Sequence, residues 1–331
     1  MKNLISLATL GLLILGYFPS PANADMVTLQ LRWITQAQFA GYYVALDKGF
    51  YSQEGLEVTI QPGGPDVETI PAITDGRADI IVEWMPPALA AREQGIALVN
   101  IAQPFKSSGM MLVCRKDAGV ETSADFRGKR IAVWFSGNEY PFLSWMSQLG
   151  IPVTGGPDGI DLLRQDFNID PLLDRQAACI SAMSYNEYGQ VLDAGVSADE
   201  LVVFRYEDHG VATLEDGLYV LEGKLGDPAF SDRMVRFVRA SLRGWRYAVQ
   251  HPEETVKIIL DNDSTGTLTE KHQTRMMDEI ARLVAGTDGS LRPSDYQRTV
   301  ATLLAGSSDP VITREPEGAW THEITDATED Y

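Results

Sequence analysis

The alternation of short apolar strands with helical segments constrains the fold of this chain most. Apolar residues alternate with polar ones at positions 27–33 and again at 56–60, and residues 39–49 between them have the pattern of a helix. A period of two indicates a half-buried strand, so the stretch predicts a βαβ unit. The two strands of such a unit are parallel and joined by a right-handed crossover. We therefore expect an α/β protein built on open, largely parallel sheets.

The same alternation continues in two series, which predicts two lobes. Further strands are expected at 78–84, 96–102, 109–114, 126–134, 178–184 and 201–204, with helices at 69–76 and 138–149. The charged run Arg115-Lys116-Asp117 ends the strand at 109–114, and we place the first crossing between lobes there. The apolar strand 217–221 is expected to bring the chain back. Lobe I is then predicted as residues 25–113 and 216–331, lobe II as 114–215, and the lobes are joined by a two-strand hinge.

The C-terminal third is predicted to be helical. Asp227-Pro228 offers an N-cap and a first-turn proline to an amphipathic helix, and Pro252 begins a second. Two more helices are expected within residues 267–305. The acidic end, residues 315–331, is predicted to be mobile.

The N-terminus reads as an export signal. Lys2 precedes an apolar run from Leu4 to Leu15 that is too short to span a bilayer, and Ala22-Asn23-Ala24 is a cleavage site of the A-x-A type. We expect residues 1–24 to be removed after Ala24 and the mature chain to be periplasmic. An uncleaved membrane anchor is the alternative.

Charge and histidine spacing exclude two classes of partner. The 331-residue chain carries a net charge of −19 and has no basic stripe, which argues against nucleic acid. The four histidines are scattered, without the close spacing of a metal site, so we predict no metal and no cofactor.

The two cysteines lie in separate apolar strands. Cys114 ends the run from Met110, and Cys179 lies in the run from Ala178 to Met183. Two buried free thiols are the interpretation we favour, and a single disulfide is the alternative.

Aromatic residues directly follow four of the predicted apolar strands. They are Trp33, Trp84, Trp134 and Tyr185. Ligand sites in open α/β sheets lie beyond the carboxyl ends of strands, so these rings are expected at the rims of the cleft between the lobes. A ring there can stack on a flat ligand, and core packing is the competing interpretation for each.

Polar groups near the same strand ends complete the candidate binding site. Amides and rings in the first helix-opening loop are Gln36, Gln38 and Phe39, and of the two tyrosines that follow we favour Tyr42 over Tyr43 as facing the cleft. Glu83 is placed as an acceptor for an aminopyrimidine edge. The remaining candidates come from lobe II: Gly137, Asn138, Tyr140, Asn186 and Glu187.

Several of these segments together resemble a known family. The stretch 31–60, the step Gly76-Arg77-Ala78-Asp79, Phe126-Arg127-Gly128-Lys129, Tyr185-Asn186-Glu187, Gly244-Trp245-Arg246-Tyr247-Ala248 and Pro252-Glu253-Glu254 are similar to those of the thiamine-pyrimidine-precursor family of periplasmic substrate-binding proteins. The resemblance covers nearly the whole mature chain. It implies a type II periplasmic binding-protein fold that delivers a small-molecule cargo to an ABC permease and its ATPase. We expect the protein to be a monomer.

The resemblance leaves several functions open. A thiamine pyrimidine precursor of the formylaminopyrimidine or hydroxymethylpyrimidine type is the expected cargo, and riboflavin is the near alternative. An enzyme related to the eukaryotic-type thiamine pyrimidine synthase is less favoured, because this chain lacks the cysteine-rich iron-binding run and the histidine near the position of Gln38 that the synthase carries. A module that reports its ligand to a membrane sensor is the third hypothesis.

Overall fold

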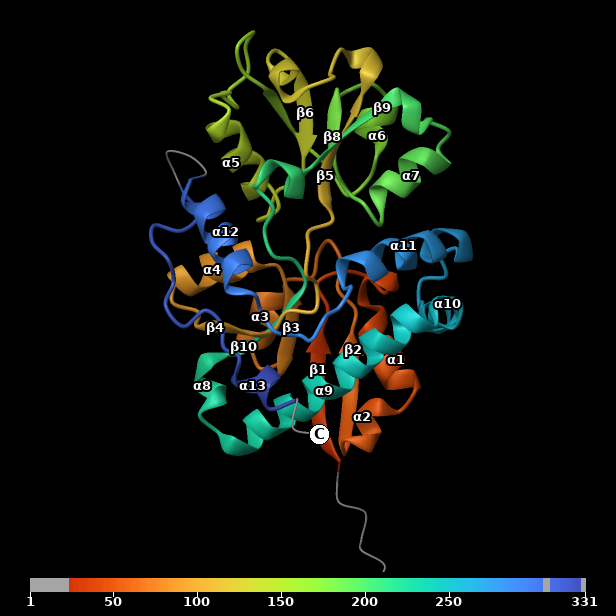
Figure 1. The fold of residues 1–331 in the computed structure, drawn as a ribbon, viewed down its shortest axis with the longest axis vertical. Coiled ribbons are helices and arrows are strands. Elements are labelled where there is room, and N and C mark those ends of the chain that lie inside the picture. The colour runs from red at the N-terminus through yellow and green to blue at the C-terminus, as the bar shows by residue number, and fades with distance from the viewer. Residues whose placement is uncertain (1–23, 306–309, 329–331) are drawn as a thin grey trace, which may run out of the picture.

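The computed structural model describes residues 24–305 and 310–328, and these form two α/β lobes, one above the other in Figure 1. The fold class predicted from the sequence is therefore confirmed. The expected signal peptide lies outside the described residues except for Ala24. Within the described part of the chain, no helix has the length and apolar character needed to cross a membrane.

Lobe I is built on a five-stranded sheet in the order β2-β1-β3-β10-β4. Its strands are β1 (Asp25–Gln30), β2 (Leu56–Gln61), β3 (Ile80–Glu83), β4 (Leu98–Ala102) and β10 (Gly217–Leu221). β1 is parallel to β2 and β3, as the βαβ pattern predicts, whereas β10 runs antiparallel to β3 and β4.

Lobe II repeats this plan in the order β7-β6-β8-β5-β9. Its strands are β5 (Met110–Arg115), β6 (Arg130–Val133), β7 (Asp161–Arg164), β8 (Cys179–Met183) and β9 (Leu201–Arg205). β6 is parallel to β7 and β8, and β5 is antiparallel to β8 and β9. In each sheet, the antiparallel strand is the one that follows a crossing from the other lobe.

Helices cover both sheets. Those of lobe I are α1 (Ala40–Asp47), α2 (Phe50–Gln53), α3 (Thr69–Thr74), α4 (Met85–Glu93), α8 (Glu222–Leu225), α9 (Pro228–Gln250), α10 (Pro252–Asp261), α11 (Glu270–Leu283), α12 (Pro293–Leu304) and α13 (Glu323–Asp326). Those of lobe II are α5 (Tyr140–Gln148), α6 (Asp170–Leu173) and α7 (Glu187–Asp193). The Asp227 side chain caps α9 by accepting from the Ala229 N–H, as predicted.

Two glycines let α1 and α9 pack closely. A Cβ on Gly41 would lie 2.2 Å from the Trp245 ring, and a Cβ on Gly244 would lie 2.0 Å from the Gly41 carbonyl oxygen. Larger residues at either position would push the helices apart. This contact holds α1, and with it the loop before α1, against the long helix of lobe I.

The crossings lie at residues 103–109 and 206–216, which corrects the predicted first boundary at 113/114. The strand expected to end lobe I is β5, and it pairs along its whole length within the sheet of lobe II. The charged run at Arg115 marks the end of a strand in lobe II. The return of the chain at β10 agrees with the prediction.

The C-terminal segment is packed, which corrects the expectation that residues 315–331 are mobile, as far as they are described. Trp320 forms an isolated β-bridge with Asn100 of β4, and the Ala319 carbonyl accepts from the Asn100 N–H at 2.9 Å. Ala319 and Ile324 are buried. The polar composition of this segment concealed the few apolar residues that anchor it.

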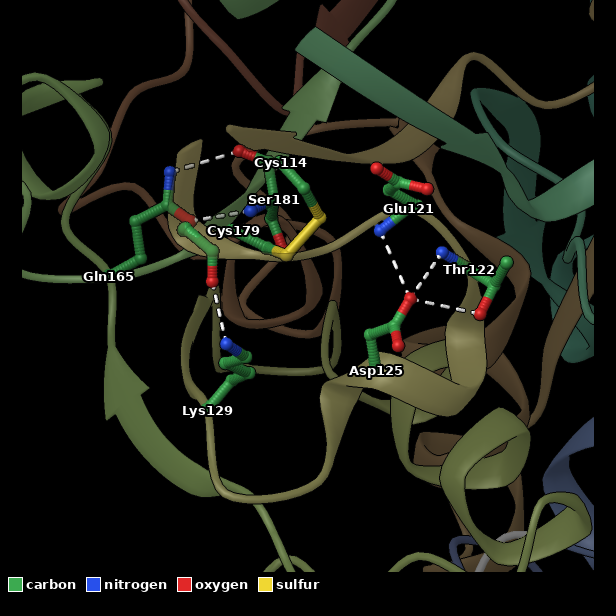
Figure 2. Close-up of a disulfide and its surroundings, with 9 residues drawn as sticks. Cys114, Glu121, Thr122, Asp125, Lys129, Gln165, Cys179 and Ser181 are labelled. Carbon is green, nitrogen blue, oxygen red and sulfur yellow. Dashed lines mark hydrogen bonds between the residues drawn. A yellow bond between two sulfur atoms is a disulfide. The ribbon is translucent and has the colours of Figure 1, made fainter. Parts of the chain in front are cut away.

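The two cysteines form one disulfide, so the prediction of two free thiols is wrong. Cys114 on β5 lies opposite Cys179 on β8, with 4.0 Å between their Cα atoms (Figure 2). Both residues are fully buried, as expected. The bridge joins the antiparallel strand of lobe II to its neighbour and closes a loop of 65 residues.

Candidate functional site

A cavity of about 380 Å³ lies between the lobes. Its walls include residues at the carboxyl ends of β1 and β3 in lobe I and of β6, β7 and β8 in lobe II. These ends of the two sheets face each other across the gap that the crossings span in Figure 1. The volume falls in the range of about 300–1,000 Å³ that is common for small-molecule sites.

All four strand-end aromatic residues line this cavity. Trp33 and Trp84 come from lobe I, and Trp134 and Tyr185 come from lobe II. A fifth ring, Phe167, follows β7 and links the two sides: its centroid lies 4.6 Å from that of Trp33 and 6.3 Å from that of Trp134. Phe167 is 45% exposed, an unusual environment for a large apolar side chain. The cavity is thus bordered by aromatic faces from both lobes.

Arg32 connects the lobes at one edge of the cavity. Its guanidinium forms an ion pair with Glu83 and lies 4.3 Å from the centroid of the Trp84 ring, both in lobe I. The same group donates to Asn138 Oδ1 of lobe II at 2.6 Å. A cation over an indole face is attracted by the ring quadrupole. Arg32 is therefore fixed by contacts within lobe I and also donates a hydrogen bond to lobe II.

The carboxylate of Glu83 is already engaged. One oxygen pairs with Arg32 and accepts from the Trp84 backbone N–H at 2.8 Å, and the other accepts from the Thr69 hydroxyl. Glu83 lines the cavity, but its partners are residues of lobe I. The structure places it as the counter-ion of Arg32, and its expected role as an acceptor for the ligand stays a prediction.

The two glutamines of the first loop are held by a hinge residue. Gln36 Nε2 donates to Gln38 Oε1 at 2.6 Å, and Gln38 Nε2 donates to Asp216 Oδ2 at 2.7 Å. The other oxygen of Asp216 accepts from Trp84 Nε1 at 3.0 Å. Burial raises the pKa of Asp216 to about 6. Asp216 has a positive φ of 48°, a conformation that non-glycine residues rarely adopt, so the second crossing turns sharply where it supports the site.

Glu187 is the buried carboxyl at this cavity without a cationic partner among the described residues. Its Oε1 accepts from Asn186 Nδ2 at 2.7 Å, and its Oε2 accepts from the Met183 N–H at 3.0 Å. It is 5% exposed, and burial raises its pKa to about 7. The buried Nε1 of Trp134, another lobe II residue that lines the cavity, has no hydrogen-bond partner within the described part of the chain. The lobe II wall thus offers a ligand the Glu187 carboxyl as an acceptor and the Trp134 indole N–H as a donor.

Gly137 allows the lobe II loop to approach lobe I. It has φ of 98°, and a Cβ there would lie 2.9 Å from Cγ of Pro87 in α4. Its N–H donates to Glu139 Oε2 at 2.8 Å. The prediction that backbone N–H groups of this loop meet a ligand therefore does not hold for Gly137, which permits a close contact between the lobes.

Ten of the fourteen candidate residues line the cavity: Trp33, Gln36, Gln38, Glu83, Trp84, Trp134, Asn138, Tyr185, Asn186 and Glu187. Phe39, Tyr42, Gly137 and Tyr140 do not. Tyr42 is 1% exposed and packs edge-on against Trp245 of α9 at 5.5 Å, which corrects the expectation that it faces the cleft. Phe39 is buried in the same core, and Tyr140 packs against the cluster around Met85 and Leu89.

Sequence reasoning missed several residues of the cavity wall. Arg32 stood inside the quoted signature, but its charge gave no indication of a cross-lobe contact. Gln165 and Phe167 follow β7, a short strand that was not predicted. Gln165 is fixed by β8, since it accepts from the Ser181 N–H at 2.8 Å and donates to the Ser181 carbonyl at 3.0 Å (Figure 2).

The residues that line the cavity lack the side chains that most often bind a metal or a covalent cofactor. The wall contains no histidine, cysteine or lysine among the residues that line it. In ranges 24–305 and 310–328, no cluster of three or more His, Cys, Asp or Glu side chains is placed to hold a metal ion. The arrangement is suited to stacking and hydrogen bonding.

Comparison with known proteins identifies the family. Residues 36–255, more than half of the chain, match the family described as NMT1/THI5 like. The chain belongs to the NMT1/THI5-like family. It is 22% identical over 244 residues to a formylaminopyrimidine-binding protein of Halalkalibacterium halodurans, covering 72% of this chain and 71% of the relative. The family resemblance inferred from the sequence is confirmed.

The names of two other relatives describe different functions. The chain is 25% identical over 245 residues to the riboflavin-binding protein RibY of Chloroflexus aurantiacus, covering 71% of this chain and 66% of that protein. It is also 25% identical over 249 residues to a 4-amino-5-hydroxymethyl-2-methylpyrimidine phosphate synthase of Legionella pneumophila, covering 70% of this chain and 72% of the synthase. The relatives thus include proteins named as binding proteins and proteins named as enzymes.

A solved structure shares the fold. The periplasmic sulfonate-binding protein SsuA of Methylobacillus flagellatus KT superimposes with a TM-score of 0.65 at 13% identity, covering 92% of this chain and 94% of SsuA. At this identity the likeness establishes the two-lobed fold.

Proposed function

We propose that this protein is the periplasmic solute-binding component of an ABC importer and that it captures a flat nitrogen heterocycle. The observation that carries the proposal is the shared cavity, in which Trp33 and Trp84 of one lobe meet Trp134 and Tyr185 of the other. Aromatic faces from both sides suit a planar cargo, and stacked pairs contribute about 0.5–1.5 kcal/mol beyond area burial. The partners are an ABC permease and its ATPase.

A thiamine pyrimidine precursor fits the two groups left at the lobe II wall. Glu187 can accept from an exocyclic amino group, because no cation of the described residues competes for it. The unpartnered indole N–H of Trp134 can donate to a ring nitrogen or a formyl oxygen. Because the buried Trp134 N–H has no partner without ligand, the site would discriminate strongly against analogues that cannot accept from it. The formylaminopyrimidine-binding relative supports this cargo class.

Capture proceeds by closure of the lobes. Contacts between the lobes such as Arg32 with Asn138 and Gly137 with Pro87 would be lost in an open form, and a cargo that touches both walls would bind the closed form better. This differential affinity shifts the population toward the closed form, which the permease would receive.

Binding without catalysis is the role that the cavity wall supports. A synthase acts chemically on its substrate, whereas the lining residues here include no lysine, histidine or cysteine to serve as a nucleophile, and the lining carboxyl of Glu187 is assigned to hydrogen bonding with the cargo. Stacking and hydrogen-bonding groups dominate instead.

Calorimetric titration of the mature protein tests the proposal. Formylaminopyrimidine and 4-amino-5-hydroxymethyl-2-methylpyrimidine are the primary probes, with riboflavin and an alkyl sulfonate as alternatives. We expect tight binding of a pyrimidine and weaker or no binding of the sulfonate. Preference for riboflavin would replace the pyrimidine assignment, and turnover of a bound pyrimidine would overturn the assignment as a binding protein.

Variants at opposite walls test the stacking. Trp33→Ala and Trp134→Ala are each expected to weaken binding of the preferred probe by ~1–3 kcal/mol. Trp320→Ala, at a ring of lobe I that lies outside the cavity, is the matched control. Unchanged affinity in both cavity variants would refute the sandwich.

A further inference from the structure

Helix α11 joins the two lobes without lining the cavity. It belongs to lobe I, where its neighbours include α10, yet it also contacts α7 of lobe II, and Figure 1 places it directly below α7. None of its residues belongs to the cavity wall. Its contacts with lobe II therefore cannot serve as direct ligand contacts.

An ionic cluster fastens α11 to the end of α7. Arg275 pairs with Asp193 through both terminal nitrogens, at 2.9 Å each, and Lys271 Nζ lies 2.6 Å from Asp193 Oδ1. Arg275 also donates to the Gly189 carbonyl at 2.8 Å. Cations favour the C-terminal end of a helix, where backbone carbonyls lack partners. This cluster sets the register of α11 on lobe II.

In that register, the imidazole of His272 meets a residue of the cavity. Its Nε2 lies 2.8 Å from Oδ1 of Asn186, which also accepts from Gln190 Nε2 at 3.0 Å. Because this oxygen is an acceptor, the Nε2 of His272 carries the proton. Burial lowers the pKa of His272, so the ring is neutral at pH 7 with its proton on that nitrogen.

The hydrogen bonds continue from Asn186 to the carboxyl of Glu187. Asn186 Nδ2 donates to Glu187 Oε1 at 2.7 Å, and the other carboxyl oxygen accepts from the Met183 N–H. A chain thus runs from His272 through Asn186 to Glu187. With its oxygen held by two donors, the amide of Asn186 presents its NH₂ group to Glu187 and retains one N–H for another partner.

The next residue along α11, Gln273, forms a hydrogen bond to the cavity rim of lobe I. Oε1 of Gln273, a fully buried residue, accepts from the Ala37 N–H at 2.7 Å. Ala37 lies between Gln36 and Gln38, which line the cavity in lobe I. Two consecutive residues of α11 therefore contact one cavity rim each, and one of these contacts crosses between the lobes.

We propose that His272 is a positioning residue for cargo recognition, which completes the chain through Asn186 to Glu187 across the boundary between the lobes. The inference rests on the proposed function and adds a specificity determinant outside the cavity. A cargo that binds Glu187 gains from this contact, because His272 fixes the amide that orients the carboxyl.

Replacement of His272 tests whether this chain of hydrogen bonds supports cargo binding. His272→Ala is expected to weaken binding of 4-amino-5-hydroxymethyl-2-methylpyrimidine about 2- to 12-fold, the effect of ~0.5–1.5 kcal/mol for the loss of one hydrogen bond to a part-buried acceptor. His272→Gln, whose amide can donate to the same oxygen, is expected to restore most of the affinity. His251→Ala, at an exposed histidine of lobe I, is the matched control and is expected to bind as wild type.

A second readout separates this inference from the proposed function. In the ligand-free protein, the side-chain amide resonance of Asn186, identified by its loss in Asn186→Asp, is expected to shift in His272→Ala and to return toward its position in His272→Gln. Wild-type protein that binds no probe would defeat the proposed function, whereas the amide shift would still support the His272 contact. An unmoved amide resonance, or wild-type affinity in His272→Ala, would overturn the inference.

Discussion

A buried glutamate in the second crossing should make the stability of this protein fall as pH rises. Glu215 is 2% exposed, accepts from the Gly109 N–H at 3.0 Å and accepts from the hydroxyl of Ser108. Both donors lie on the first crossing, so the carboxyl ties the two crossings together. No ion pair links Glu215 to a cation in the described part of the chain.

Burial raises the pKa of Glu215 from 4.5 to about 8, and the neighbouring carboxylates of Asp216 and Glu207 act in the same direction. The folded protein therefore holds a proton that the unfolded chain releases near pH 4.5. Between about pH 4.5 and 8 the folded state binds more protons, so the free energy of unfolding decreases as pH rises. The contribution present below pH 4.5 is lost by about pH 8.

The size of the effect follows from the shift. Each pKa unit corresponds to 1.36 kcal/mol, so the wild-type protein is expected to lose ~3–5 kcal/mol through this group across the window. Glu215→Gln keeps the shape of the side chain and does not titrate. The advantage of the variant over wild type should grow by up to ~1.4 kcal/mol for each pH unit.

Urea unfolding of both proteins at pH 5, 6, 7, 8 and 9 measures this difference. Glu187, another buried carboxyl with a raised pKa, titrates in both proteins and cancels in the comparison. Glu57→Gln, at an exposed position of β2, is the control and should follow the wild-type curve. Parallel curves for Glu215→Gln and wild type would refute the assignment of a protonated hinge carboxyl.

Three further changes test the fold and the site. Loss of the disulfide in Cys114→Ala/Cys179→Ala should lower the free energy of unfolding by ~4 kcal/mol from the loop of 65 residues, measured against the oxidised wild type; equal stability would contradict the bridge. Arg32→Met should cost ~3–5 kcal/mol, because it leaves Glu83 buried without its cation, and combining it with Glu83→Gln should recover part of the loss seen in thermal unfolding. Gly41→Ala should cost ~1–3 kcal/mol by forcing α1 away from α9, whereas Gly223→Ala, which has open space, should be nearly neutral in the same assay.

The strand-end rings were predictable because their signal is local. Trp84 follows β3, Trp134 follows β6 and Tyr185 follows β8 in sequence as in space. Parallel strands place their carboxyl ends at one edge of a sheet, so a pattern of period two followed by a ring locates that ring at the cleft. The amphipathic helix α9 was predictable for the same reason.

Contacts between distant segments could not be predicted in this way. Cys114 bonds to Cys179 because β5 pairs antiparallel with β8, and no local pattern specifies that pairing. Because β5 pairs within the lobe II sheet, the first crossing lies at residues 103–109, before the predicted boundary. Tyr42 faces the core because α9 packs on that side of α1, about 200 residues later in the chain. The counter-ion role of Glu83 likewise depends on Arg32, which comes from a different strand end.

The crystal structure of the mature protein with bound 4-amino-5-hydroxymethyl-2-methylpyrimidine tests the central claim most directly. We predict that the pyrimidine ring contacts an aromatic face from each lobe, at Trp33 or Trp84 and at Trp134 or Tyr185, with its amino group on Glu187. A pyrimidine held by one lobe alone, or bound outside the cavity between the lobes, would contradict the account.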